Sequence, residues 1–419
     1  SAQNPASNTD MYNVAVGYGA GAAVTTGTSN TLIGGLAGDA ITTASNNTAV
    51  GYLSLSANTT GVSNTALGAF ALDANTTAAN NVAVGSQSLG ANTTGSSNVA
   101  VGTNALDANT TGGSNISVGI NALGANTTAS NNVAVGHESL KSNTTGASNV
   151  AVGAYALDAN VSSSSNTAIG YNSLTTNTAA SNTAVGKDSL EANSSGGSNV
   201  AVGADALSSN TTASNNTAVG KSALVANTTG ANNTAVGKSA LTANTTGTQN
   251  VAVGSQSLLA HTTGNYNVAV GQNVLVSNTT ASDNTSVGAY SLDSNTTGGS
   301  NTAVGKEALG SNTTASNNTG LGYLALQLNT TGTRNTAVGN TALNANTTGN
   351  YNTAVGSHSL FYNTTASNNT ATGYLALHKT TTGANNSAVG FGALEENTTG
   401  AGNTAVGYTA SDAITTGSN

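Results

Sequence analysis

The chain has 419 residues, of which only 5% are charged and 4% are aromatic, and its formal net charge is −8. It contains no basic run, so nucleic-acid binding has no electrostatic basis. It also contains no cysteine, which excludes disulfides and thiolate metal sites. Because such a composition cannot build a large aromatic core, the order must come from stacked small, β-branched and amide side chains.

Residues 1 to 12 lie outside any periodic pattern and contain the only proline, Pro5, and the only methionine, Met11. We expect this segment to be a cap, a linker or an exchanged strand. The tandem repeat begins directly after it.

A 17-residue unit recurs 24 times from Asn13 onward, and its clearest copy, residues 233–249, reads NTAVGKSALTANTTGTQ. We number each unit from its first asparagine, which is position 1. Glycine stands at position 5 of every unit. One unit this short cannot bury its own apolar face, so neighbouring units must stack. The sequence therefore predicts an all-β, parallel β-solenoid of 24 coils that runs continuously over residues 13–419.

The coils at residues 13–46 and 403–419 differ from the others. Position 12 is usually asparagine, but Val24, Ile41 and Ile414 stand there in these coils. A solenoid normally needs a polar cap at each end. We therefore take these three residues as a candidate subunit junction, at which the last coil docks on the first coil of another copy.

One irregularity lies in the middle of the repeat. The step from Asn166 to Asn182 is 16 residues long instead of 17. We expect a local bulge or a tightened turn there.

The opening N-T/V-A-V-G of each unit alternates as a half-buried strand does. We expect valine at position 4 to point inward and alanine at position 3 to point outward. Glycine at position 5 predicts a turn that needs positive φ or a close backbone approach. A second short strand should follow, with leucine at position 9 inside and acidic residues at position 10 outside. Asn-Thr-Thr-Gly then closes the coil.

Identical residues stack on one another in such a coil, so asparagines at positions 1 and 12 should form amide ladders. The predicted structural ladder in the clearest copy is Asn233, Val236, Gly237, Leu241 and Asn244. The alanine column at position 3 would form a long apolar strip on the surface, and such strips usually mark interfaces. The pattern therefore favours lateral self-association.

The string N-T/V-A-V/I-G-x-x-A/S-L resembles the head repeats of YadA-like trimeric autotransporter adhesins, which have a similar S-V-A-I-G-x-x-A core. The fuller N-T-A-V-G-x-x-A-L-x-x-N-T-T-G unit is similar to repeats of bacteriophage tail fibres and other bacterial surface proteins. The resemblance covers residues 13–419. It implies a left-handed parallel β-roll in a homotrimer, a role as a fibre or adhesive shaft, and no catalytic residue set.

Residues that could carry chemistry are sparse. The four histidines, His137, His261, His358 and His378, fall at different positions of their coils, so we interpret them as surface residues and predict no metal site. Tyrosine recurs at position 6, on an expected solvent-facing corner. These tyrosines form a candidate surface contact stripe: Tyr18, Tyr52, Tyr171, Tyr323, Tyr374 and Tyr408.

We therefore expect a non-enzymatic structural fibre or filament protein with no cofactor, which binds copies of itself laterally and end to end. It would lie outside the cell, on the cell surface or in a virion tail fibre. An adhesin or phage receptor-binding shaft that recognises cell-surface glycans is the alternative. A third hypothesis is an ice-binding solenoid, because most coils carry Thr-Thr, although only one threonine of each pair can face outward.

Overall fold

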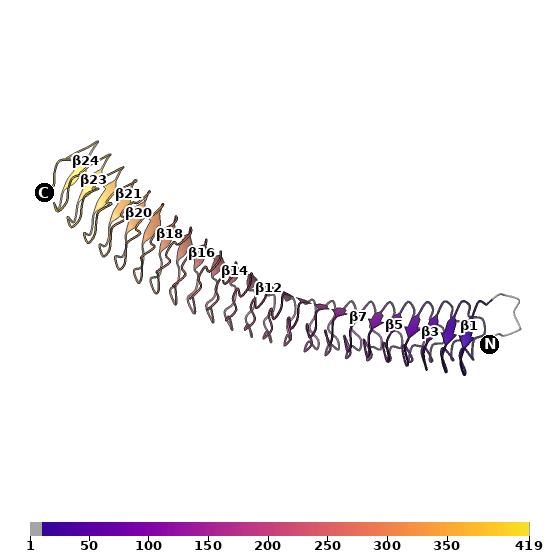
Figure 1. Cartoon of the computed structure of the whole chain (residues 1–419). Coiled ribbons are helices and arrows are strands. Elements are labelled where there is room, and N and C mark those ends of the chain that lie inside the picture. The colour runs from indigo at the N-terminus through magenta and orange to yellow at the C-terminus, as the bar shows by residue number, and fades with distance from the viewer. Residues whose placement is uncertain (1–10, 419) are drawn as a thin grey trace. The chain divides into compact units, whose positions relative to one another are not determined.

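The computed structural model describes residues 11–418, which form two units, residues 11–212 and 213–418, and we describe each unit by itself. Each unit is a stack of parallel coils with one short strand per coil (Figure 1). The predicted parallel β-solenoid with 17-residue coils is therefore confirmed. The expectation for residues 1–12 falls mostly outside the described residues, although the Met11 carbonyl accepts a 2.8 Å bond from the amide of Ser29.

The strands of the first unit occupy positions 2 to 4 of their coils: β1 (Val14–Val16), β2 (Thr31–Ile33), β3 (Thr48–Val50), β4 (Thr65–Leu67), β5 (Val82–Val84), β6 (Val99–Val101), β7 (Ile116–Val118), β8 (Val133–Val135), β9 (Val150–Val152), β10 (Thr167–Ile169), β11 (Thr183–Val185) and β12 (Val200–Val202). Those of the second unit do the same: β13 (Thr217–Val219), β14 (Thr234–Val236), β15 (Val251–Val253), β16 (Val268–Val270), β17 (Thr285–Val287), β18 (Thr302–Val304), β19 (Thr319–Leu321), β20 (Thr336–Val338), β21 (Thr353–Val355), β22 (Thr370–Thr372), β23 (Ser387–Val389) and β24 (Thr404–Val406).

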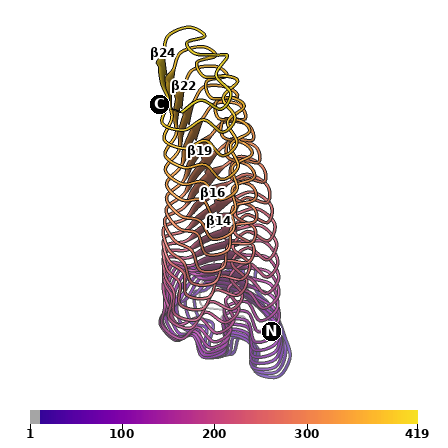
Figure 2. The ribbon, with the colours of Figure 1, turned by 90° about the vertical axis from the view of Figure 1, so that its left-hand side faces the viewer.

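Within each unit, every strand pairs in parallel with the strand of the next coil, and like positions face each other. Thr234 pairs with Val251, and Ala235 pairs with Ala252. The bonds run in both directions along the stack: the amide of Thr234 donates to the next coil at Asn250, and that of Gly237 donates to the previous coil at Val219, both at 2.8 Å. Successive coils of a unit therefore lie directly over one another (Figure 2).

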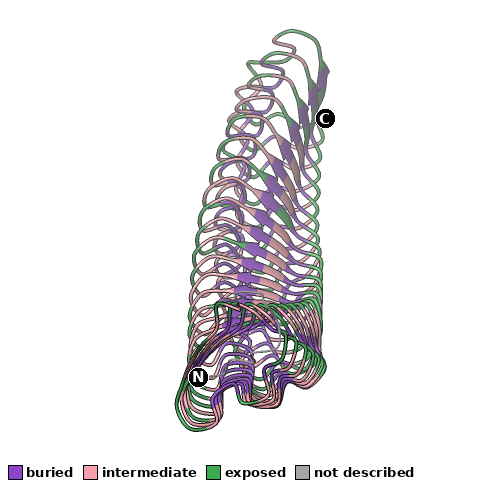
Figure 3. Ribbon diagram, turned by 90° about the vertical axis from the view of Figure 1, so that its right-hand side faces the viewer, coloured by how far each residue is buried: buried purple, intermediate pink, exposed green. Residues whose placement is uncertain are grey.

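The predicted orientation of the strand is wrong. Ala235, at position 3, is fully buried, whereas Val236, at position 4, is 36% exposed. The same pattern holds along the strands of both units except β1, whose middle residue is only half-buried: the middle residue is buried and its two neighbours are partly or fully exposed (Figure 3). The structural ladder therefore keeps Asn233, Gly237, Leu241 and Asn244, and Val236 also stacks on Val253, but it does so on the outer face instead of in the interior. The alanine column lies inside, so it forms no apolar strip on the surface of the described residues.

The physical reason is the narrow interior of the coil, where position 3 packs against position 9. At Gly320, which occupies position 3, an added Cβ would lie 3.4 Å from Leu309 Cγ, the leucine at position 9 of the preceding coil. The coil that begins at Asn30 has the two sizes exchanged, with Leu32 at position 3 fully buried and Gly38 at position 9. A large side chain at one position therefore requires a small one at the other.

The predicted second strand is also wrong, because positions 6 to 11 form turns. Two i to i−3 bonds close them in the clearest copy: Ala240 donates to the Gly237 carbonyl at 3.3 Å, and Asn244 donates to the Leu241 carbonyl at 3.2 Å. Ser239 and Leu241 have φ values of 57° and 51°. This left-handed backbone costs a non-glycine residue about 1–2 kcal/mol. Complete burial of the leucine, worth about 1.5–3 kcal/mol, offsets that cost.

The 16-residue coil contains a tightened turn, one of the two outcomes predicted. Asn177 Nδ2 donates to the carbonyl of Ala179, two residues ahead, whereas its counterparts donate three residues ahead. The strand register is kept, with Thr167 opposite Thr183. Asn166 Nδ2 is left buried without a hydrogen-bond partner. The coil that is one residue shorter therefore leaves one donor unsatisfied.

Candidate functional site

The asparagines at position 1 close each coil and bind the next one. Asn233 Nδ2 donates to the Gly247 carbonyl of its own coil at 2.8 Å, and its Oδ1 accepts from the backbone amide of Asn250 at 2.9 Å. The predicted ladder at position 1 is therefore present, but it mainly joins side chain to backbone. Asn233 and Asn250 are both fully buried, so each of these hydrogen bonds satisfies a polar group that water cannot reach.

The asparagines at position 12 form the second ladder, from side chain to side chain. Asn244 Nδ2 donates to Asn227 Oδ1 at 2.8 Å and to the Gly247 carbonyl at 3.1 Å. One carbonyl at position 15 thus accepts from the asparagines at positions 1 and 12 together. Glycine at position 5 is equally constrained: Gly237 has φ of +135°, and an added Cβ would lie 2.5 Å from the Gly254 carbonyl oxygen.

His261 occupies position 12 and is completely buried, so its interpretation as a surface residue was wrong. Its Nε2 lies 2.8 Å from the Gly264 carbonyl, and its Nδ1 lies 3.2 Å from Asn278 Nδ2. These partners assign a neutral ring with the proton on Nε2. The ring has no further donor, and Asn244 Oδ1 is left without a partner. Burial lowers the pKa of His261, and the bond to Gly264 opposes that shift.

The other histidines lie nearer the surface, and two of them are neighbours. The ring centroids of His358 and His378 are 6.1 Å apart, and the ring of Phe361 stacks on His378 at 5.6 Å. Different coil positions therefore did not keep these histidines apart, because positions 7 and 10 of adjacent coils face the same corner. Among residues 11–418 no group of three His, Cys, Asp or Glu side chains could hold a metal ion.

The six tyrosines of the candidate contact stripe are all exposed, from 47% for Tyr171 to 86% for Tyr18. Contacts between aromatic rings connect only some of the residues that stand at position 6 in successive coils. Phe391 lies between Tyr374 and Tyr408, with centroid distances of 5.3 and 5.2 Å. Elsewhere lysines, small residues and single residues such as Ile120 and Gln272 interrupt the column. The stripe is therefore continuous only over the coils of β22 to β24.

The threonine pair presents one residue per coil to solvent, as expected. Thr245 Oγ1 donates to the Thr262 carbonyl of the next coil at 3.2 Å, whereas Thr246 is exposed. The exposed threonines therefore form a single file.

The candidate junction residues are placed differently in the two units. In the first unit Ile41 is fully buried and Val24 is 8% exposed, so both extend the column at position 12 with apolar side chains. In the second unit Ile414 is only partly buried. The coils that carry Val24 and Ile414 also have highly exposed side chains at position 6, with Tyr18 86% and Tyr408 77% exposed, whereas the coil of Ile41 has Gly35 there.

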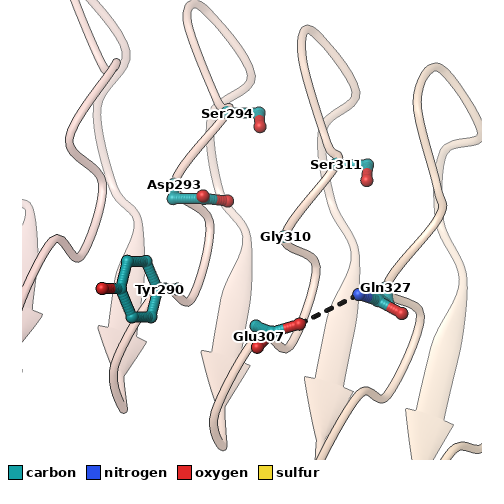
Figure 4. A pocket seen from close by; sticks show the side chains of 7 residues that line it. All are labelled: Tyr290, Asp293, Ser294, Glu307, Gly310, Ser311 and Gln327. Atoms are coloured by element: carbon teal, nitrogen blue, oxygen red, sulfur yellow. Dashed lines mark hydrogen bonds between the residues drawn. The ribbon is translucent and has the colours of Figure 1, made fainter.

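Position 10 holds half-buried carboxylates beside notches in the surface, which the sequence interpretation missed. Burial raises the pKa of Asp73, Asp107 and Asp293, and bonds from backbone amides oppose the shift. In each case the next coil has glycine at position 10, which leaves a cavity between coils. Figure 4 shows the notch at Gly310, where Tyr290, Asp293 and Glu307 surround the open space. The signal in the sequence was aspartate at position 10 of one coil followed by glycine at position 10 of the next coil, and this pattern could have revealed the notch.

Comparison with known proteins does not assign this chain to a family, because no protein-family model and no curated protein matches the sequence. The described residues contain no helix that could cross a membrane.

Proposed function

We propose that this chain is a structural protein, a non-enzymatic shaft that assembles with copies of itself into an extracellular, cell-surface or virion fibre. The observation that carries the proposal is the outer face of the strands. Positions 2 and 4 point away from the interior, and no charged residue stands at either position in any coil. Position 4 is valine, isoleucine or leucine in every coil except one, where Thr372 replaces it.

This outer face supports lateral association between copies of the chain. Val236, Val304 and Val389 are 36%, 39% and 42% exposed, and their equivalents repeat in successive coils of each unit. A contiguous exposed apolar strip usually marks an interaction site. The strand edges already pair within the stack, so the outer face is the part of each strand that is left for a partner. The same face occurs on every copy, which makes a second and a third copy the natural occupants.

A mass measurement by light scattering tests this proposal. We expect the wild type to be a homotrimer, and we expect Val236→Lys combined with Val304→Lys to shift it toward the monomer, because buried lysines at the interface would lack partners. Thr246→Lys, at an exposed position on another side of the coil, is the matched control and should stay trimeric. A monomeric wild type at high concentration would refute lateral assembly, and so would an unchanged mass for the double variant with native circular dichroism.

End-to-end association is the second part of the proposal. Ile414, Val24 and Ile41 are apolar where most coils have the asparagine ladder, so stacking the coil of β24 on the coil of β1 of another copy would bring like side chains together. We expect electron microscopy to show filaments for the wild type and only short particles for Ile414→Asp. Thr416→Asp, two residues away at the exposed position 14, is the control. Filaments of equal length for Ile414→Asp would contradict this junction.

A further inference from the structure

The notch at Gly310 is a small cavity between three successive coils of the second unit. Its volume is about 280 Å³, just below the range of about 300–1,000 Å³ that is typical of small-molecule sites. Most coils have a side chain at position 10, and Gly310 has none. Its φ is not in the left-handed region, and an added Cβ would lie 3.3 Å from the Glu307 carbonyl oxygen, a contact that a small shift relieves, and 3.5 Å from Asp293 Oδ1. Glycine is therefore not required there by the backbone, and its effect is to keep the space beside the carboxylate open.

The walls of this notch combine one aromatic ring with several hydrogen-bonding groups (Figure 4). Tyr290 is 38% exposed and lies on the same coil as Asp293. Glu307 stands at the other side, where its Oε2 accepts a 3.1 Å bond from Gln327 Nε2. The hydroxyls of Ser294 and Ser311 border the opening. The arrangement offers mainly acceptors beside the face of a ring.

A similar set of residues occurs again in the first unit, with Ala74 and Ala91 in place of the two serines and Asp107 in place of Gln327. Phe70 stands at the position of Tyr290, Asp73 at that of Asp293, Gln87 at that of Glu307, and Gly90 at that of Gly310. These residues line a cavity of about 310 Å³, and an added Cβ on Gly90 would again lie 3.5 Å from the Asp73 carboxylate. Positions 7 and 10 vary widely among the coils, so the repetition of aromatic, acid, polar residue and glycine in both units points to a common purpose.

A third notch, at Gly124, lacks one element of this set. It is lined by Asp107, Asn121 and Lys141, and position 7 beside Asp107 is Asn104 instead of an aromatic residue. It therefore offers an internal comparison, with the acid and the glycine but without the ring.

Backbone amides donate to both half-buried aspartates, and Ser294 also donates to Asp293, but a carboxylate has about four acceptor sites and can accept further bonds. None of the ion pairs among residues 11–418 includes Asp73 or Asp293. A hydroxyl group from a ligand can donate to such a carboxylate, and bonds to charged groups are worth about 1.5–3 kcal/mol. An anionic ligand is disfavoured by Asp293 and Glu307 together and by the net charge of −8.

We propose that the two aromatic notches, at Gly90 and Gly310, are binding sites for a neutral saccharide. The apolar face of one sugar ring packs on Phe70 or Tyr290, and hydroxyl groups of the sugar donate to the carboxylate of Asp73 or Asp293. The polar residue at position 7 of the following coil, Gln87 or Glu307, orients further hydroxyls. This site lies at positions 7 and 10, apart from the uncharged outer face of the strands, so it does not depend on assembly.

The test is saturation-transfer NMR on the full chain with a panel of neutral probes: glucose, galactose, mannose, N-acetylglucosamine and their β-linked disaccharides. We expect at least one probe to bind in the millimolar range. Gly90→Gln combined with Gly310→Gln fills both notches with a side chain that Gln327 shows to be tolerated at position 10. We expect this variant to lose the signal or to bind at least about tenfold more weakly.

Val225→Gln, at position 10 of another coil, is the matched control and should bind like the wild type. Phe70→Ala combined with Tyr290→Ala should also lose binding, because it leaves notches like the one at Gly124. The proposal is overturned if no probe binds the wild type, or if binding survives in the filled variant. Equal or stronger binding of sialic acid than of the neutral probes would likewise overturn it.

Discussion

Replacing His261 by asparagine should stabilise the protein, because it completes the interrupted ladder at position 12. In the intact ladder Asn346 donates to Asn329 Oδ1 at 2.8 Å and accepts from Asn363 Nδ2 at 2.9 Å. Asn244 Oδ1 lacks the second of these bonds, since the neutral ring of His261 has no donor left for it. A buried acceptor without a partner costs about 1–3 kcal/mol. Asparagine is smaller than histidine and fills less of the space, so we expect a net gain of about 1 kcal/mol at pH 7.5.

The gain should increase at lower pH. Burial lowers the pKa of His261 in the folded protein, whereas the unfolded chain titrates near about 6.5. Between these two values the unfolded chain binds a proton that the folded protein does not, so the free energy of unfolding of the wild type falls as the pH decreases. His261→Asn removes this contribution, and the difference between variant and wild type should therefore be larger at pH 5 than at pH 7.5.

Urea denaturation at the two pH values measures both effects, and hydrogen exchange at the amides of Asn244 and Asn278 shows whether the change is local. His137→Asn is the matched control, because the side chain of His137 is 45% exposed and lies outside the ladder. The control should match the wild type at pH 7.5. An unchanged or lower midpoint for His261→Asn at pH 7.5 would refute the ladder argument, and a pH dependence equal to that of the wild type would refute the titration argument.

Three further substitutions test the cross-section of the coil by urea denaturation. Gly237→Ala should cost at least about 2 kcal/mol, because its backbone conformation is one that alanine rarely adopts, whereas Gly310→Ala should be nearly neutral. Ala235→Val should destabilise by about 1–3 kcal/mol through overpacking. Val236→Ala, measured at a concentration low enough for the chain to be monomeric, should change stability by less than about 0.5 kcal/mol, and the reverse order of the two effects would show that position 4 lies inside. Asp158→Asn should stabilise at pH 7, because burial raises the pKa of Asp158 above 3.8 and leaves its Oδ1 without a partner. That gain should fade as the pH falls through the raised pKa, and a larger gain at pH 4 than at pH 7 would contradict the direction of the shift.

The period and the turn glycines of this fold could be predicted, because both depend on repetition alone. The inner face of the strand could not be predicted from alternation, since alternation separates two faces without saying which is buried. Assigning the larger residue to the interior failed because the coil is narrow. The exchange of sizes between Leu32 and Gly38 was visible in the sequence, and it would have placed positions 3 and 9 together inside.

The turns at positions 6 to 11 had no comparable signal. Ser239 and Leu241 adopt a left-handed backbone that neither residue type favours, and only the packing and bonds of the stacked coils impose it. The notches were missed for a related reason. The acids at position 10 were interpreted one at a time as solvent-facing, although Asp293 becomes significant only beside the glycine that stands 17 residues later.

The bonds that join one coil to the next have a consequence for how the chain folds. Most of them connect residues about 17 positions apart, as in the pair Asn233 and Asn250. Contacts between residues this close in sequence form quickly, and their separation does not grow with the length of the chain. Each finished coil presents donors and acceptors that the next segment can use at once. A chain built in this way can fold progressively as it emerges from a ribosome or an export channel, without waiting for its distant end.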